Sequence, residues 1–142
     1  MSEQNKAIVG RMIDDLWNQG RLEVIDEVYA EDYADRSPGL PPGSSGDRDG
    51  QKQFVQAFRA AFPDIVGEVE DEIAEGDRVV QRWSVQATHQ GDFMGIPASG
   101  KRVSFSGTST YRLTGGKIAE EWTHADMLGL MTQLGVIPEP GA

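Results

Sequence analysis

The sequence predicts an α+β fold in which N-terminal helices pack on a strongly curved antiparallel sheet. Apolar residues recur with the period of a helix in the first part of the chain, and an alternating strand pattern takes over after Pro63. Glycine-containing turns then separate the alternating segments. The 142 residues fit one domain of ordinary size, roughly 100–150 residues, so residues 1–142 are expected to fold as a single domain.

Helical periodicity is clearest near the N-terminus. Ile8, Met12 and Leu16 recur every four residues and make an apolar stripe. Gly20 suits the left-handed residue that commonly follows a helix, and Pro63 stops the last of these helices. The predicted helices are Glu3–Gln19, Leu22–Tyr29 and Gln51–Phe62.

Four long strands are expected in the second half of the chain. In the first of them, Val69 and Ile73 should share one face while Glu68, Glu70 and Glu72 share the solvated face. Strands of about ten residues exceed the usual five or six and coil strongly. A coiled sheet covered by helices leaves an apolar hollow on its concave side. The predicted strands are Ile65–Ala74, Arg78–Thr88, Lys101–Leu113 and Lys117–Ala125.

The remaining segments are turns, loops and one short helix. The Pro- and Gly-rich segment 36–50 and the tail 138–142 are predicted to be mobile. Gly115–Gly116 suits a tight hairpin turn. Asp126 can cap a final helix, Met127–Leu134.

Composition excludes several classes of function. The chain has no cysteine, which rules out disulfides, thiolate nucleophiles and cysteine metal sites. Its net charge of −10 repels a phosphate backbone, so no nucleic-acid partner is expected. No apolar run approaches the roughly 20 residues that span a bilayer, and the N-terminus lacks a secretory signal. We therefore expect a cytoplasmic protein without a membrane partner.

Two stretches of the sequence carry a family resemblance. Residues 88–101, THQGDFMGIPASGK, resemble the glycine-rich loop of the SnoaL-like polyketide (ester) cyclases, and residues 116–122, GKIAEEW, resemble their C-terminal signature. The resemblance implies the cone-shaped fold of the nuclear transport factor 2-like (NTF2-like) superfamily, with a substrate pocket between sheet and helices and a homodimer formed through the sheet's outer face. It also implies cofactor-free aldol closure of a ring on a hydrophobic keto-ester, with a carboxylate as general acid/base.

This sequence departs from the family at the catalytic position. Gapless alignment on the C-terminal signature puts the cyclases' catalytic aspartate at Thr123 and an assisting histidine at Ser109. Threonine cannot act as that base near neutral pH. The departure keeps open related isomerisation or dehydration, cofactor-independent hydroxylation, and a non-catalytic module that binds hydrophobic ligands or dimerises.

The last strand holds most of the candidate catalytic residues. Alternation places Glu121 and Thr123 on one face, and Trp122, His124 and Asp126 on the other unless a bulge intervenes. In one hypothesis Glu121 lies in the apolar cone, where desolvation raises its pKa. In another, His124 is a base that Asp126 orients. Alternatively, Asp126 only caps a helix and Glu121 is exposed or paired.

The second histidine, His89, begins the glycine-rich loop. It either polarises a substrate oxygen or anchors the loop through hydrogen bonds. Zinc at His89 and His124 is disfavoured because no short-range ligand spacing supports it. The expected catalytic residues are Glu121, His124, Asp126 and His89, without metal or cofactor. The expected substrate-binding residues are Trp83, Phe105, Ser109, Tyr111, Trp122, Thr123, Phe54 and Phe58.

Overall fold

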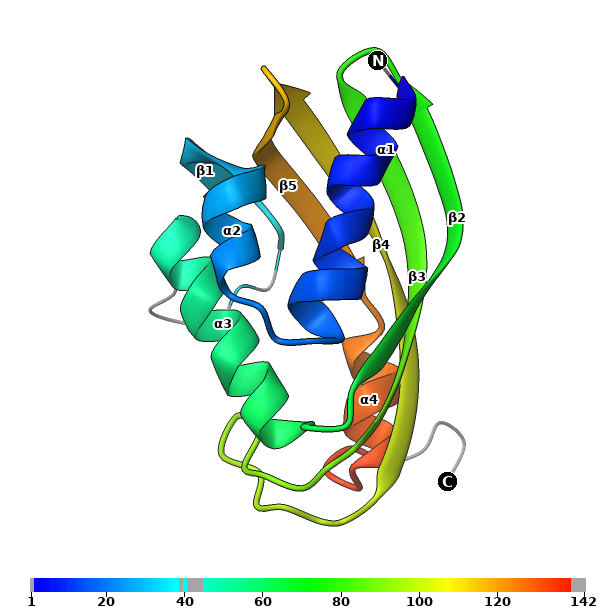
Figure 1. The fold of residues 1–142 in the computed structure, drawn as a ribbon. Helices are drawn as coiled ribbons and strands as arrows, with labels where there is room; N and C mark the ends of the chain where they lie inside the picture. The colour runs from blue at the N-terminus through cyan, green and yellow to red at the C-terminus, as the bar shows by residue number, and fades with distance from the viewer. Residues whose placement is uncertain (1, 39, 41–44, 139–142) are drawn as a thin grey trace.

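The computed structural model describes residues 2–38, 40 and 45–138. Three helices lie on one side of a long sheet whose strands curve around them (Figure 1). The sheet has the strand order β1-β5-β4-β3-β2, which confirms the predicted α+β class. The elements are α1 (Ser2–Arg11), a π-helix η1 (Met12–Trp17), α2 (Glu23–Val28), β1 (Tyr29–Asp35), α3 (Arg48–Ala61), β2 (Val66–Glu75), β3 (Arg78–Thr88), β4 (Arg102–Thr114), β5 (Lys117–Ala125) and α4 (Met127–Gln133).

The sheet has one strand more than the sequence predicted. Strand β1 lies at the edge and runs parallel to β5, with Asp35 opposite Glu121. Its sequence, YAEDYAD, is rich in alanine and acidic residues, which are depleted in strands. The other four strands pair antiparallel, as expected.

Two of the predicted helices differ clearly from the structure. The expected first helix divides into α1 and the π-helix η1. Helix α3 begins at Arg48 because the Asp47 carboxylate accepts a hydrogen bond from the Gly50 amide at 2.8 Å. The end of the predicted loop 36–50 is therefore helical, and its residues 39 and 41–44 lie outside the described residues, as do residues 139–142 of the tail. The predicted cap of α4 is confirmed, since Asp126 accepts from the Gly129 amide at 2.9 Å.

Two register shifts decide which side chains face the helices. In β2 the pairing with β3 shifts at Glu70, so side chains beyond it change face. Ile73 consequently lies on the outer face, 67% exposed, and Glu72 turns inward, so the predicted facing of both residues was wrong. In β5 the pairing with β4 shifts at Ala119, and Ile118 and Glu121 are both buried on the inner side.

The core consists of two apolar clusters between the sheet and the helices. One gathers side chains of α1, η1, α2 and β1 against the sheet, and the other gathers α3, the 89–100 loop and α4. Trp17, the last residue of η1, packs against both clusters. Its carbonyl oxygen accepts a hydrogen bond from Arg59, which ties η1 to α3.

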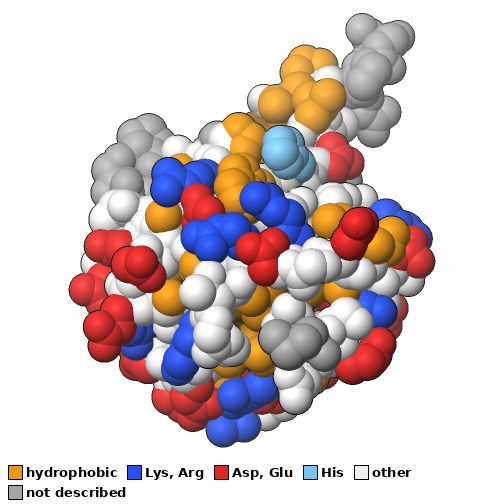
Figure 2. Space-filling model, turned by 90° about the horizontal axis from the view of Figure 1, so that it is seen from above, with side chains coloured by type: hydrophobic (Ala, Val, Ile, Leu, Met, Phe, Trp, Pro, Cys, Tyr) orange, Lys and Arg blue, Asp and Glu red, His pale blue; other side chains and the backbone are white. Residues whose placement is uncertain are grey.

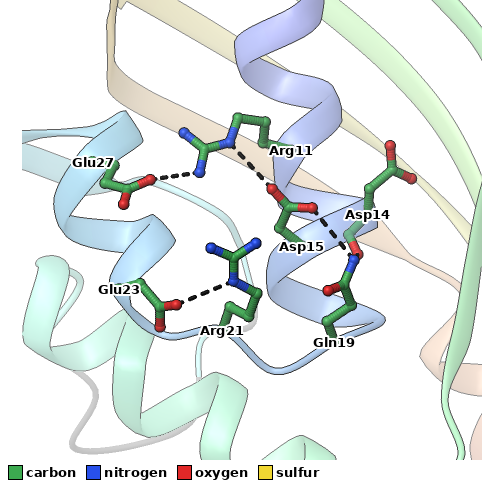
Figure 3. Close-up of polar contacts among 7 residues, drawn as sticks. All are labelled: Arg11, Asp14, Asp15, Gln19, Arg21, Glu23 and Glu27. Carbon is green, nitrogen blue, oxygen red and sulfur yellow. Dashed lines mark hydrogen bonds and ion pairs between the residues drawn. The ribbon is translucent and has the colours of Figure 1, made fainter.

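Ion pairs connect the first two helical segments on the surface (Figure 3). Arg11 donates to Glu27 of α2 at 2.5 Å and to Asp15 of η1 at 3.2 Å, while Arg21 pairs with Glu23 at 3.1 Å. Exposed pairs of this kind contribute little to stability, about 0–1 kcal/mol each. Among these pairs, Arg11–Glu27 joins the end of α1 to α2.

The surface seen from above mixes charges of both signs with hydrophobic side chains (Figure 2). None of the described helices combines the length and the apolar character that crossing a membrane requires.

Candidate active site

Glu121 is a buried carboxylate on the inner face of the sheet. It is 6% exposed, and the shift at Ala119 together with the parallel pairing to Asp35 points it toward the helices. Burial and, after it, the nearby Asp35 carboxylate together raise the pKa of Glu121 from 4.5 to about 7. A group with this pKa is close to half ionised at neutral pH.

Hydrogen bonds hold both oxygens of this carboxylate. The Tyr33 hydroxyl donates to Oε1 at 2.7 Å, and the Thr123 hydroxyl donates to Oε2 at 2.7 Å. Both bonds favour the ionised form and lower the pKa of Glu121, although burial outweighs them. The two hydrogen bonds therefore fix the orientation of the ionised carboxylate.

A directed chain of hydrogen bonds leads to Glu121 across three strands. The Trp83 indole donates to Ser109 Oγ at 3.0 Å, and Ser109 Oγ lies 2.8 Å from Thr123 Oγ1. Because Thr123 has one hydroxyl proton, which it gives to Glu121, Ser109 must donate to Thr123. Every donor in the chain thus points toward the carboxylate.

This arrangement suits a general base. Such a group works best when its pKa lies near the operating pH and its position is fixed. Glu121 meets both conditions, and Tyr111, directly opposite it on β4, contributes a buried ring rather than a charge. Burial also raises the pKa of Tyr111 well above its usual value, so this phenol stays neutral.

Aromatic side chains extend from this chain of hydrogen bonds toward α3. The Trp83 and Phe105 rings meet edge to face with centroids 6.0 Å apart, and Phe105 lies 6.0 Å from Phe58. Phe54 is 37% exposed at the border of this group. A β-carbon at Gly107 would lie 2.4 Å from the Trp83 ring, so glycine is what lets the indole lie across β4.

Residues of β1 complete the site, and sequence reasoning missed them. Tyr33 and Asp35 flank Glu121, the Ser37 amide donates to Asp35 at 2.9 Å, and Ser37 Oγ accepts from the Thr123 amide at 2.8 Å. The signal that could have found them is the two-residue period of Tyr33 and Asp35, which places both on one face of a strand.

Trp122, His124 and Asp126 lie away from Glu121, around the sheet's outer face. Trp122 packs beneath the Arg78 guanidinium, 5.2 Å from the ring centroid. His124 is exposed and lines a shallow hollow of about 330 Å³ together with Asp126. Asp126 caps α4. The structure therefore does not bring these three side chains together with Glu121.

His89 is fully buried at the start of the glycine-rich loop. Its Nδ1 accepts from the Ser99 amide at 3.3 Å and lies 2.9 Å from Ser99 Oγ, while its ring packs 5.4 Å from that of Phe62. These contacts match the loop-anchoring alternative for His89. Within the described part of the chain, no three histidine, aspartate or glutamate side chains gather as they would around a metal ion.

Tyr33→Phe is expected to raise the pKa of Glu121 further, by about one unit. The variant removes a donor to the ionised carboxylate, and such a hydrogen bond contributes roughly 1.5 kcal/mol. Carbon-13 NMR titration of the Glu121 carboxyl measures the shift. Tyr111→Phe is the matched control, because Tyr111 donates no hydrogen bond to Glu121 among the described contacts. Equal titration curves for Tyr33→Phe and wild type would show that the hydroxyl does not act on Glu121.

Comparison with solved structures finds the same fold in a candidate hydroxylase and in candidate polyketide cyclases. AclR from Streptomyces galilaeus, a candidate hydroxylase, is 32% identical with a TM-score of 0.86, and the match covers 98% of this chain and 85% of AclR. IdmH from Streptomyces antibioticus, a candidate polyketide cyclase, is 32% identical with a TM-score of 0.81 over 94% of this chain and 99% of IdmH.

A second candidate polyketide cyclase, from Acidithiobacillus ferrooxidans, is 32% identical with a TM-score of 0.80, covering 95% of this chain and 96% of that protein. No curated protein matches the sequence. The family model of SnoaL-like polyketide cyclases matches residues 7–134. The chain therefore belongs to the SnoaL-like polyketide cyclase family, with its NTF2-like α+β fold.

Proposed function

We propose that this chain is a cofactor-free enzyme that removes a proton next to a carbonyl group of a hydrophobic keto-ester, with Glu121 as the base. One observation carries the proposal: a buried carboxylate on the inner face has both oxygens hydrogen-bonded and a pKa raised to about 7. The aromatic group that includes Trp83 and Phe105 offers an apolar surface for the substrate beside it.

The reaction that fits the family is an intramolecular aldol ring closure. Glu121 takes the proton from the α-carbon, and the electron pair of the broken C–H bond forms an enolate. The enolate carbon then bonds to a second carbonyl carbon of the same molecule. The resulting alkoxide takes the proton back from Glu121, so the product is a cyclic isomer of the substrate. Loss of water from that product would be the related dehydration.

Glu121 offers a replacement for the aspartate that the family alignment puts at Thr123. The two residues point to the same side of β5, and Thr123 donates to Glu121 at 2.7 Å. A base moved by two residues along a strand stays on the same face. Thr123 then supports the base instead of being one.

Deuterium exchange tests the proposal without knowledge of the natural substrate. The bicyclic ketone α-tetralone has slowly exchanging α-protons, and proton NMR in D₂O follows their loss. The enzyme is expected to accelerate exchange above the buffer rate. Exchange at the buffer rate, with α-tetralone shown to bind, would instead favour the non-catalytic binding module.

A hydroxylase is a second candidate, favoured by the likeness to AclR, itself a candidate hydroxylase. The first step is the same proton removal by Glu121, after which the carbanion adds dioxygen and a proton to give a hydroperoxide. A two-electron reductant of the thiol class then converts the hydroperoxide to the alcohol and water. This outcome needs dioxygen as co-reactant, so product formation that stops under nitrogen would distinguish it from ring closure.

We also propose that two copies pair through the outer face of the sheet. Ile73 on β2 is 67% exposed there, and the family resemblance implies a homodimer. Sedimentation velocity should give twice the chain mass, and Ile73→Glu should shift the protein to monomer. Met94→Glu is the control, since Met94 is 61% exposed on the 89–100 loop. A monomeric wild type would contradict the proposal.

A further inference from the structure

We propose that Gln81 is a specificity residue whose side-chain oxygen accepts a hydrogen bond from a hydroxyl group of the substrate. The inference rests on the proposed function, because it concerns the inner face that holds Glu121. It goes beyond that function by naming a second point of recognition and the chemical group recognised there.

Gln81 lies in the same polar row as the chain that leads to Glu121. It sits on β3 opposite Ser109 of β4, which in turn lies opposite Thr123 of β5. The residue is 0% exposed, between buried Val79 and half-buried Trp83 on the inner side. A fully buried glutamine is uncommon and is normally hydrogen-bonded at both ends.

The orientation of the Gln81 amide is fixed by Glu72. The register shift at Glu70 turns Glu72 inward, and Gln81 Nε2 donates to the Glu72 carboxylate at 3.2 Å. The reverse orientation would place the amide oxygen against that carboxylate, where both groups are acceptors. The other polar atom of the Gln81 amide, which Glu72 does not contact, is therefore Oε1, an acceptor.

The three donors of the hydrogen-bonded chain that leads to Glu121 are already committed elsewhere. The Trp83 indole donates to Ser109, Ser109 to Thr123, and Thr123 to Glu121. Each has no further proton to offer. Gln81 Oε1 has no hydrogen-bond partner within the part of the chain that the structure describes. A buried carbonyl oxygen without a donor is unfavourable, and a ligand that supplies the donor removes this cost.

This geometry indicates the kind of molecule that would fit. The ligand needs a neutral O–H donor near Gln81 and an acidic C–H beside a carbonyl near Glu121. The two residues lie on strands separated by two inter-strand spacings, roughly 10 Å. A substrate that reaches both is extended, as a polycyclic compound with a hydroxyl at one end is, rather than a single ring.

A pair of ligands that differ in one group tests the role of Gln81. The probes are β-naphthol and β-methylnaphthalene, which have nearly the same size, and calorimetry gives their affinities. Gln81→Met keeps the length of the side chain but removes the acceptor. It is expected to weaken β-naphthol binding about fivefold to tenfold and to leave β-methylnaphthalene binding unchanged. Gln86→Met, the same change at an exposed position of β3, should alter neither affinity.

The outcomes separate this inference from the proposed function. An equal loss of affinity for both probes would overturn the role of Gln81. No loss of affinity for either probe would overturn it as well, and would mean that a water molecule donates to the Gln81 oxygen. If Gln81→Met loses affinity only for β-naphthol and the wild type does not catalyse α-tetralone exchange, the role of Gln81 is supported and the enzyme proposal is rejected. Failure of wild type to bind β-naphthol would overturn the role of Gln81, whereas α-tetralone exchange decides the enzyme proposal separately. Gln81→Leu provides the same comparison if Gln81→Met does not fold.

Discussion

Glu121→Gln is expected to slow proton removal from α-tetralone by about 10²–10⁴-fold, the usual contribution of a positioned general base. Glutamine has nearly the same shape, and its one carbonyl oxygen can accept from either the Tyr33 or the Thr123 hydroxyl while its NH2 group faces the other. The amide cannot take a proton at neutral pH. The loss should appear in kcat, because the apolar surface that binds the ketone is unchanged. Exchange rates followed by NMR measure it.

The pH dependence of the wild-type rate gives an independent check on the same residue. Only the ionised form of Glu121 is a base, and its pKa is raised to about 7. The rate should therefore rise through neutral pH and level off above about pH 8. A carboxylate with an ordinary pKa near 4.5 would give a profile that is already flat at pH 6.

Glu120→Gln is the matched control on the same strand. Glu120 faces outward, where it pairs with Arg36 and with Arg112 at 2.5 Å. Because the Glu120 side chain is remote from the inner face, Glu120→Gln should keep the wild-type exchange rate within about twofold. Full activity in Glu121→Gln, or an equal loss in both variants, would show that Glu121 is not the base.

Much of the fold was predictable because its signals are local. The four antiparallel strands follow from a two-residue period, and the caps at Gly20 and Asp126 follow from local backbone chemistry. The edge strand β1 could not be predicted in this way, since its alanine and acidic residues adopt a strand only by pairing with β5, far away in the sequence. Pairing of this kind is a tertiary effect that overrides local propensity.

The candidate site was predictable only in part for a related reason. Alternation correctly separated Glu121 and Thr123 from Trp122 and His124, because β5 is regular from Glu120 to its end. Alternation failed in β2, where one extra residue at Glu70 reversed the facing of everything beyond it. A bulge arises from the partner strand's register, which no single-strand pattern contains.

The stability of the protein should also depend on Glu121, and in a direction opposite to that of most carboxylates. Its folded pKa, about 7, exceeds the ordinary value of 4.5, so the folded state holds a proton that the unfolded chain has released. The stabilisation from this group is fully present below about pH 4.5 and is lost as the pH rises through 7. Glutamine at this position resembles the protonated, neutral form at every pH.

Glu121→Gln should therefore gain stability relative to wild type as the pH rises. The difference in free energy of unfolding is expected to grow by about 3 kcal/mol between pH 4.5 and pH 8, since each unit of pKa shift corresponds to about 1.4 kcal/mol. Urea denaturation of both proteins across this range measures it. Glu120→Gln should show the reverse trend, because Arg36 and Arg112 lower the pKa of Glu120 and its stabilisation disappears at low pH. A constant difference between wild type and Glu121→Gln would mean that Glu121 titrates normally and that the interior does not tune it for proton transfer.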